Sequence, residues 1–338
     1  MARSADWCSR PKPAAVIWLT SALLFYVLFS TLRRFTSPNA LSNNKALYAE
    51  RRSILYSKMA RDLDEHGPTF LRKGETSQSL ALSDIFEIKD GEVKPILKPA
   101  NPPVRANVLY LSPKFSVSYL CICFLVKEMF FSLWNLNAPH MLFTWCRDAV
   151  KDIFSPHFTN MVWFQNSSLY HFSMFHASHH ITAVPATEQE IDIEAHAVQE
   201  VAAAACPLKI VLDRVVLTST GVLLGCWQVI SGTDPIEIRA ALKAALPHAP
   251  EKQLYDNAIL HTSFARILGH PTSLKGLGET SEQLQFFHEL VTHLDNRLRG
   301  FEAVVSELWF VEEYDILALA LDGNIKIRPF QLGCKSMS

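Results

Sequence analysis

The sequence predicts an α+β domain built from two matching halves, behind an N-terminal membrane-spanning helix. Two observations predict this arrangement. The order strand, helix, strand, strand occurs twice after about residue 160, and the run 14–32 carries no charged residue. A repeated order of elements predicts that each half buries one face of an antiparallel sheet under its own helix. The halves would then form two pseudo-symmetric lobes with their helices outside.

Composition allows a sizeable core and excludes some classes of protein. The chain has 338 residues, of which 49% are hydrophobic, and its net charge of −1 gives no reason to expect nucleic-acid binding from charge alone. Its 7 cysteines are an odd number and form no C-x-x-C motif. This argues against a disulfide framework and a zinc ribbon, so we expect buried or idle thiols.

The uncharged run 14–32 is expected to be a transmembrane helix, preceded by a short tail, 1–13. As a helix it spans about 28 Å, close to the hydrocarbon thickness of a bilayer. A cleaved signal peptide is the alternative, but it would have a shorter apolar region followed by an A-x-A site. The orientation stays open, because basic residues lie on both sides of the run.

Residues 33–103 are expected to form a juxtamembrane linker that contains some structure. Apolar residues at helical spacing predict an amphipathic helix over 45–64, and Asp90-Gly91 predicts the turn of a hairpin over 86–97. The proline-rich stretch 98–104 predicts the boundary of a domain that spans 104–334.

Within this domain a strand is expected at 106–111. An atypical insertion follows at 115–145, and a helix is expected near 148–154. The apolar part of the insertion is too short to cross a bilayer, so a re-entrant helix and a buried helix both remain open.

The repeat itself is read from periodicity, capping residues and turns. In the first half, Thr187 and Glu190 predict a capping box at a helix start, and in the second half a helix is expected near Thr280. A further helix between the halves is predicted by Asp234 and Pro235. The expected strands are 169–175, 209–217 and 222–230, then 258–268, 301–310 and 314–321.

Two histidines occupy matching places in this repeat. His-x-Ser/Thr occurs six times, but only His171 and His261 stand in the equivalent strands of the two halves. Because side chains alternate along a strand, Ser173 shares a face with His171, and Ser263 with His261. The residues between them would point into the core, so two imidazoles and two hydroxyls would converge on one groove.

These residue types suit phosphodiester cleavage without a metal ion. Imidazole titrates near neutral pH, so one histidine can act as base and the other as acid. Hydroxyl groups two residues away can donate hydrogen bonds to the phosphate as charge develops. No metal or cofactor is expected, and the sequence leaves the roles of acid and base unassigned.

The tetrads His171-Phe172-Ser173-Met174 and His261-Thr262-Ser263-Phe264 resemble the paired motifs of the 2H phosphoesterase superfamily, which includes RNA ligase-like and 2′,3′-cyclic phosphodiesterase proteins. The second motif continues to Arg266, as the ligase-like branch often does. The resemblance implies the fold of that superfamily and hydrolysis of a cyclic phosphate or phosphodiester, in RNA or a small nucleotide. Strand alternation places Arg266, a candidate phosphate ligand, opposite His261 unless the strand is bulged.

Two rival functions remain open: a binding module for a nucleotide or RNA end, and a membrane scaffold with structural histidines.

Three further groups of residues have a structural interpretation beside a functional one. His176, His179 and His180 suggest a loop rather than a metal site, and Tyr170 and Tyr314 suggest packing rather than base stacking. The sequon at Asn166 lies just before the first motif, where a glycan would obstruct the groove, which favours a cytosolic domain or an unused sequon. Protein partners are not predicted.

Overall fold

The structure is a computed structural model that describes residues 38–68, 80–112, 141–158, 160–269 and 280–334. The chain forms two compact units, 1–50 and 51–338, and helix α2 (Pro38–His66) crosses the limit between them. None of the helices in the described ranges is both long and apolar enough to cross a membrane. The expected anchor, 14–32, lies outside those ranges.

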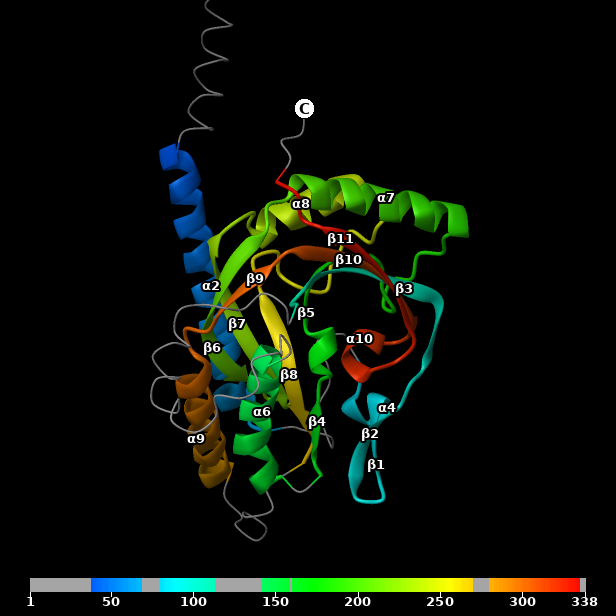
Figure 1. The fold of residues 1–338 in the computed structure, drawn as a ribbon. Coiled ribbons are helices and arrows are strands. Elements are labelled where there is room, and N and C mark those ends of the chain that lie inside the picture. The colour runs from blue at the N-terminus through cyan, green and yellow to red at the C-terminus, as the bar shows by residue number, and fades with distance from the viewer. Residues whose placement is uncertain (1–37, 69–79, 113–140, 159, 270–279, 335–338) are drawn as a thin grey trace, which may run out of the picture. The chain divides into compact units, whose positions relative to one another are not determined.

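The second unit is α+β, with antiparallel sheets and helices packed on them, as predicted (Figure 1). Each sheet combines strands from both halves of the repeat, so the expectation that each half buries a sheet under its own helix is wrong. One sheet has four strands in the order β11-β10-β3-β5. These strands are β3 (Pro99–Tyr110), β5 (His171–Ser178), β10 (Glu307–Asp315) and β11 (Ile325–Gln331). The other sheet has five strands in the order β4-β8-β7-β6-β9. These strands are β4 (Val162–Phe164), β6 (Leu208–Leu217), β7 (Val222–Ser231), β8 (His261–Ile267) and β9 (Glu302–Val305).

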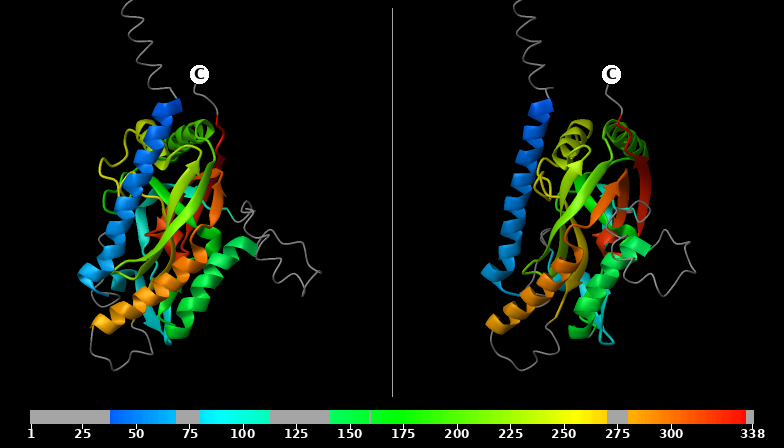
Figure 2. Two further views of the ribbon diagram at one scale, coloured as in Figure 1. Left: turned by 90° about the vertical axis from the view of Figure 1, so that its left-hand side faces the viewer. Right: turned by 60° about the vertical axis from the view of Figure 1, so that its left-hand side comes forward.

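Four longer helices complete the unit: α6 (Met141–Phe154), α7 (Glu188–Ala204), α8 (Pro235–Ala245) and α9 (Thr280–Leu298). Helices α6 and α9 lie side by side in both views of Figure 2 and contact the five-stranded sheet. Helix α7 contacts the four-stranded sheet and lies beside α8. The short elements are α4 (Leu82–Ile85), β1 (Phe86–Lys89), β2 (Glu92–Pro95), α10 (Ala318–Leu321), and the 3-10 turns Ser155–His157 and Ser167–Leu169.

A single hydrophobic core joins the inner faces of the two sheets. Phe172 of β5 meets Trp227 of β7 edge to face at 5.8 Å, and Tyr170 meets Phe264 of β8 at 5.7 Å. Helix α9 contributes Phe287 to the same core. Burial of this apolar surface fixes the two strands that carry the histidine motifs against each other.

The opposite faces of the sheets are covered only in part. Residues of α2 beyond Glu50, such as Tyr56 and Met59, pack on the outer face of β6 and β7. Leu319 of α10 packs in the same way on the outer face of β3 and β10. Neither of these two apolar clusters includes a residue of β5 or β8.

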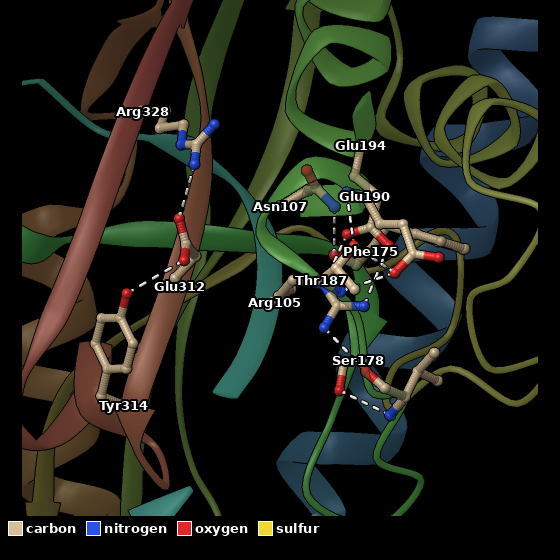
Figure 3. Close-up of polar contacts among 11 residues, drawn as sticks. Arg105, Asn107, Phe175, Ser178, Thr187, Glu190, Glu194, Glu312, Tyr314 and Arg328 are labelled. Carbon is tan, nitrogen blue, oxygen red and sulfur yellow. Dashed lines mark hydrogen bonds and ion pairs between the residues drawn. The ribbon is translucent and has the colours of Figure 1, made fainter. Parts of the chain in front are cut away.

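Buried polar contacts fix the helices to the sheets. Arg105 of β3 donates to both oxygens of Glu194 on α7, at 2.7 and 3.1 Å (Figure 3). Thr187 and Glu190 form the predicted capping box at the start of α7, also drawn in Figure 3. Asp234 caps α8 and also accepts two hydrogen bonds from buried Arg52 of α2, at 3.0 and 2.9 Å.

Several predicted elements are present at shifted limits. The expected helix 45–64 lies within α2, and the hairpin turns at Asp90-Gly91, where both residues have positive φ. The expected boundary 98–104 falls in and beside β3, which begins at Pro99. The first motif strand begins at His171 rather than Leu169 and extends to Ser178, so His176 lies within it.

The expected strands 301–310 and 314–321 are both wrong. The first is divided between β9 and β10, which belong to different sheets. The second is interrupted by a turn. Leu317 and Asp322 have φ of 60° and 59°, so the backbone leaves the extended conformation at both residues. Between them the chain forms the helical turn α10, whose Leu319 N–H donates to the Glu313 carboxylate at 3.1 Å. The last strand is β11, which pairs with β10 further along the chain.

The expectation of idle thiols is wrong for two of the cysteines. Cys206 and Cys334 form a disulfide across 128 residues. Cys146 and Cys226 are buried thiols, as expected. Sequence spacing could not reveal the pair, because the fold alone brings the end of α7 and the end of the chain together.

Candidate functional site

The first motif lies at the start of β5 with the predicted alternation. His171 and Ser173 are half-buried, whereas Phe172 and Met174 are buried in the core. Both motif side chains therefore lie on the outer face of the four-stranded sheet. Alternating side chains along an extended strand account for this directly.

The second motif lies at the start of β8 with the same alternation. His261 and Ser263 are half-buried, whereas Thr262 and Phe264 are 1% exposed. The strands β5 and β8 belong to different sheets and contact each other. The two motifs thus begin neighbouring strands, each on the face directed away from the shared core.

A β-bulge sets the direction of Arg266. Ser263 and Ala265 pair with consecutive residues of β7, so Phe264 is an extra residue in the ladder. An extra residue reverses the alternation beyond it, which returns Arg266 to the face of His261. The half-burial of Arg266 agrees with this direction. Simple alternation had placed Arg266 on the opposite face.

The first motif contains a matching bulge. Ser173 and Phe175 pair with consecutive residues of β3, so Met174 is the extra residue. The bulge brings His176 to the face of His171, at the place that corresponds to Arg266 in the other half. His176 is 7% exposed, and burial, followed by the nearby His179, lowers its pKa to about 3. The loop expected for His176 is therefore wrong, and its imidazole is neutral.

Arg239 of α8 ties the two motif strands together. Its guanidinium donates to the carbonyl oxygens of Ser173 and Met174 in β5, at 2.7 and 3.0 Å. It also donates to those of Ile259 and Asn257, just before β8, both at 2.8 Å. One buried side chain thus satisfies carbonyl groups from both halves of the repeat. The spacing of the repeat could not predict this role, because α8 lies between the halves.

The imidazole of His171 is oriented by the backbone. Its Nδ1 lies 2.8 Å from the carbonyl oxygen of Leu169, which only accepts, so Nδ1 carries the proton and Nε2 is left for a substrate. Burial lowers the pKa of His171, and the hydrogen bond to Leu169 raises it. The carbonyl oxygen therefore favours the protonated form of this ring.

The imidazole of His261 also has a lowered pKa. Burial first, then the positive charges of Arg239 and His171, lower its pKa to about 4. The influence of His171 indicates that the two imidazoles lie within electrostatic range of each other. The ring of Tyr255 stands edge-on to His261 at 5.2 Å. The ring of His261 is therefore unprotonated at neutral pH.

One guanidinium atom of Arg266 lacks a partner in the part of the chain that the structure describes. Its Nη1 is buried and has no hydrogen-bond acceptor among the described residues. Burial lowers the pKa of Arg266 to about 10, so the side chain is still charged at neutral pH. A buried, charged donor without an acceptor is costly, and an anion bound at this face would remove the cost.

Three other residues singled out in the sequence have different surroundings. Tyr170 is buried in the core. Tyr314 lies on β10, which β3 separates from β5, and it donates to Glu312 (Figure 3). Asn166 is exposed in the turn before β5. Sequence reasoning missed Arg239 and placed His176 in a loop rather than in β5. The bulge that directs His176 depends on the register of β5 with β3, and a single sequence does not contain that register.

Comparisons with known proteins give little beyond this geometry. Neither a protein-family model nor a curated protein sequence matches the chain. Among solved structures, the crystal structure of TT0787 of Thermus thermophilus is similar, with a TM-score of 0.40 and 11% sequence identity. The likeness covers 68% of this chain and 97% of that chain. At that level it carries no argument about function.

Proposed function

We propose that the protein is a metal-independent phosphodiesterase of the 2H type, acting on a cyclic phosphate or phosphodiester of RNA or a small nucleotide. One observation carries the proposal. Two strands related by the internal repeat each begin with His-x-Ser, each contain a bulge after the serine, and contact each other. The two sheets are then the pseudo-symmetric lobes of that superfamily, and residues 14–32 hold the domain at a lipid bilayer.

The surroundings of the two imidazoles support different roles for the two histidines. His261, whose pKa is lowered to about 4 by burial and by the charges of Arg239 and His171, is unprotonated and takes a proton from water as the general base. The water oxygen forms the new bond to phosphorus. His171, whose protonated form is favoured by the Leu169 carbonyl oxygen, donates a proton to the leaving ribose oxygen as the phosphorus–oxygen bond breaks. A cyclic phosphate and one water thus become a phosphate monoester.

The remaining groups hold the phosphate. Ser173 and Ser263 donate to its non-bridging oxygens from the two strands, and the unpartnered Nη1 of Arg266 supplies a charged donor. Because Arg239 fixes the backbone of both strands, the distance between these donors is set before the substrate binds. Such preorganised donors stabilise charge that develops in the transition state.

The test is to incubate the full-length protein with a 2′,3′-cyclic nucleotide and to follow formation of the monoester. We expect turnover in the presence of a metal chelator. Binding without product would contradict catalysis and favour the nucleotide-binding module. Neither binding nor product would favour the scaffold, in which the histidines serve only the fold.

The pH dependence of kcat/KM follows from the two imidazoles. The rate should rise as the pH passes about 4, where His261 loses its proton. It should fall as the pH rises through the pKa of His171, which lies below its ordinary value of 6.5. We therefore expect a bell-shaped profile with its maximum on the acidic side of 6.5, measured with the free enzyme and low substrate. A maximum above about pH 7 would contradict the assignment.

Replacement of Arg266 tests whether this residue binds phosphate or serves only the fold. Arg266→Met should raise KM by about 10- to 100-fold, because it removes a charge-assisted hydrogen bond. The same change should raise the free energy of unfolding, because it removes a buried charge whose Nη1 has no acceptor among the described residues. Enzyme assays and urea unfolding measure the two effects. Exposed Arg297→Met, whose partner is Asp152, is the control for loss of an arginine elsewhere. A destabilised variant with unchanged KM would show that Arg266 is structural.

A further inference from the structure

The disulfide joins Cys206, just after α7, to Cys334. Gly333 and Cys334 are held beside the end of α7 by hydrogen bonds from Gly333 N to Ala202 O and from Cys334 N to Ala205 O, both at 3.1 Å. Cys206 N donates to the Thr233 hydroxyl at 2.7 Å. These backbone contacts lie beside the disulfide and hold the two cysteines next to each other.

The other described thiols are protected from exchange with this bond. Cys146 and Cys226 are both buried, and burial raises the pKa of Cys146 to about 12 and that of Cys226 further. Exchange requires a thiolate that can reach the sulfur, so neither thiol competes for Cys206 or Cys334. Among the described cysteines, oxidation thus selects a single pairing.

An exposed sequon lies on the same unit. Asn166-Ser167-Ser168 is the one Asn-x-Ser/Thr sequence in the chain. Asn166 and Ser168 are exposed, and the Asn166 amide nitrogen donates to exposed Asp322 at 3.1 Å. The atom that would carry a sugar therefore faces a solvent-exposed carboxylate rather than the core.

We propose that the domain folds on the oxidising, lumenal side of a secretory membrane, and that Asn166 carries an N-linked glycan there. Disulfides persist in such compartments and are rare in reducing ones. The two thiols lose two protons and two electrons to the disulfide of an oxidoreductase, which becomes a dithiol. In the glycosylation step the Asn166 amide nitrogen forms a bond to the first sugar carbon, loses a proton, and displaces a lipid-linked pyrophosphate. The disulfide thus reverses the preference for a cytosolic domain that the position of the sequon had suggested.

The glycan is tested by expressing the full-length chain in eukaryotic cells and treating it with a peptide-N-glycosidase. We expect the untreated protein to migrate more slowly by the mass of one glycan. Asn166→Gln and Ser168→Ala should each remove the shift, whereas Ser168→Thr, which keeps the sequon, should retain it. Absence of a shift from the unsubstituted chain would overturn the proposal.

The disulfide is tested in the same cells with a thiol-reactive polymer added at lysis. Cys206 and Cys334 should react only after reduction, and Cys206→Ser should make Cys334 reactive without reduction. The number of polymers added to the full chain is compared with the number added to the Cys206→Ser, Cys334→Ser double variant. The difference comes from these two sites and not from the other cysteines. Reaction of both cysteines in unreduced wild-type protein would overturn the proposal, whatever the phosphodiesterase assay shows.

Discussion

His171→Ala and His261→Ala should each lower kcat for a 2′,3′-cyclic nucleotide by about 10²- to 10⁴-fold, the usual contribution of a positioned acid or base. Each substitution removes a proton-transfer group but leaves the buried neighbours on both sides in place. The free energy of unfolding should change too little to unfold the protein, so that the fall in kcat comes from the missing imidazole. Steady-state kinetics and chemical denaturation of the same preparations check both statements.

The control for these variants is His196→Ala. His196 lies on α7, its side chain is 71% exposed, and its neighbour Glu200 lies 3.9 Å away. It should keep wild-type kcat. The acid–base account is wrong if His171→Ala and His261→Ala have the same kcat as His196→Ala but a much lower free energy of unfolding. The two histidines would then be structural.

Arg239→Lys should lower the free energy of unfolding by at least about 3 kcal/mol, a large loss for a change that keeps the charge. The guanidinium donates to four carbonyl oxygens, two from β5 and two before β8. A lysine ammonium cannot span this set, so several acceptors would lose their donor. Because β5 and β8 are then less firmly fixed, kcat should fall as well. Urea unfolding and kinetics measure the two losses.

Arg299→Lys provides the matched comparison for Arg239→Lys. Arg299 also donates to a carbonyl oxygen, that of Asp213 at 2.9 Å, but its side chain is 60% exposed. Its replacement should change the free energy of unfolding by no more than about 0.5 kcal/mol. Equal stability of the two variants would show that the contacts of Arg239 do not hold the strands.

The parts of the fold that depend on local sequence could be predicted. Thr187 and Glu190 predict the start of α7, Asp234 predicts that of α8, and Asp90-Gly91 predicts the hairpin. The alternation within the first three residues of each motif also follows from strand geometry alone. In these cases the signal and its structural consequence lie within a few residues of each other.

The remaining features depend on contacts between distant parts of the chain. The bulges at Met174 and Phe264 exist only in the register with β3 and β7, yet they decide where His176 and Arg266 point. The pairing of Cys206 with a residue 128 positions away has the same origin. Arg239 acts through backbone carbonyl groups, which carry no signature in the sequence.

The most direct measurement of the central claim is kcat of the double variant His171→Ala, His261→Ala beside the two single variants. If the imidazoles serve one phosphodiester, removal of the second should add little to removal of the first. We predict that the double variant retains the activity of the more impaired single variant within about fivefold. Two results would contradict a shared site. In one, the fold-loss of kcat in the double variant equals the product of the two single losses. In the other, the single variants are as active as the wild type.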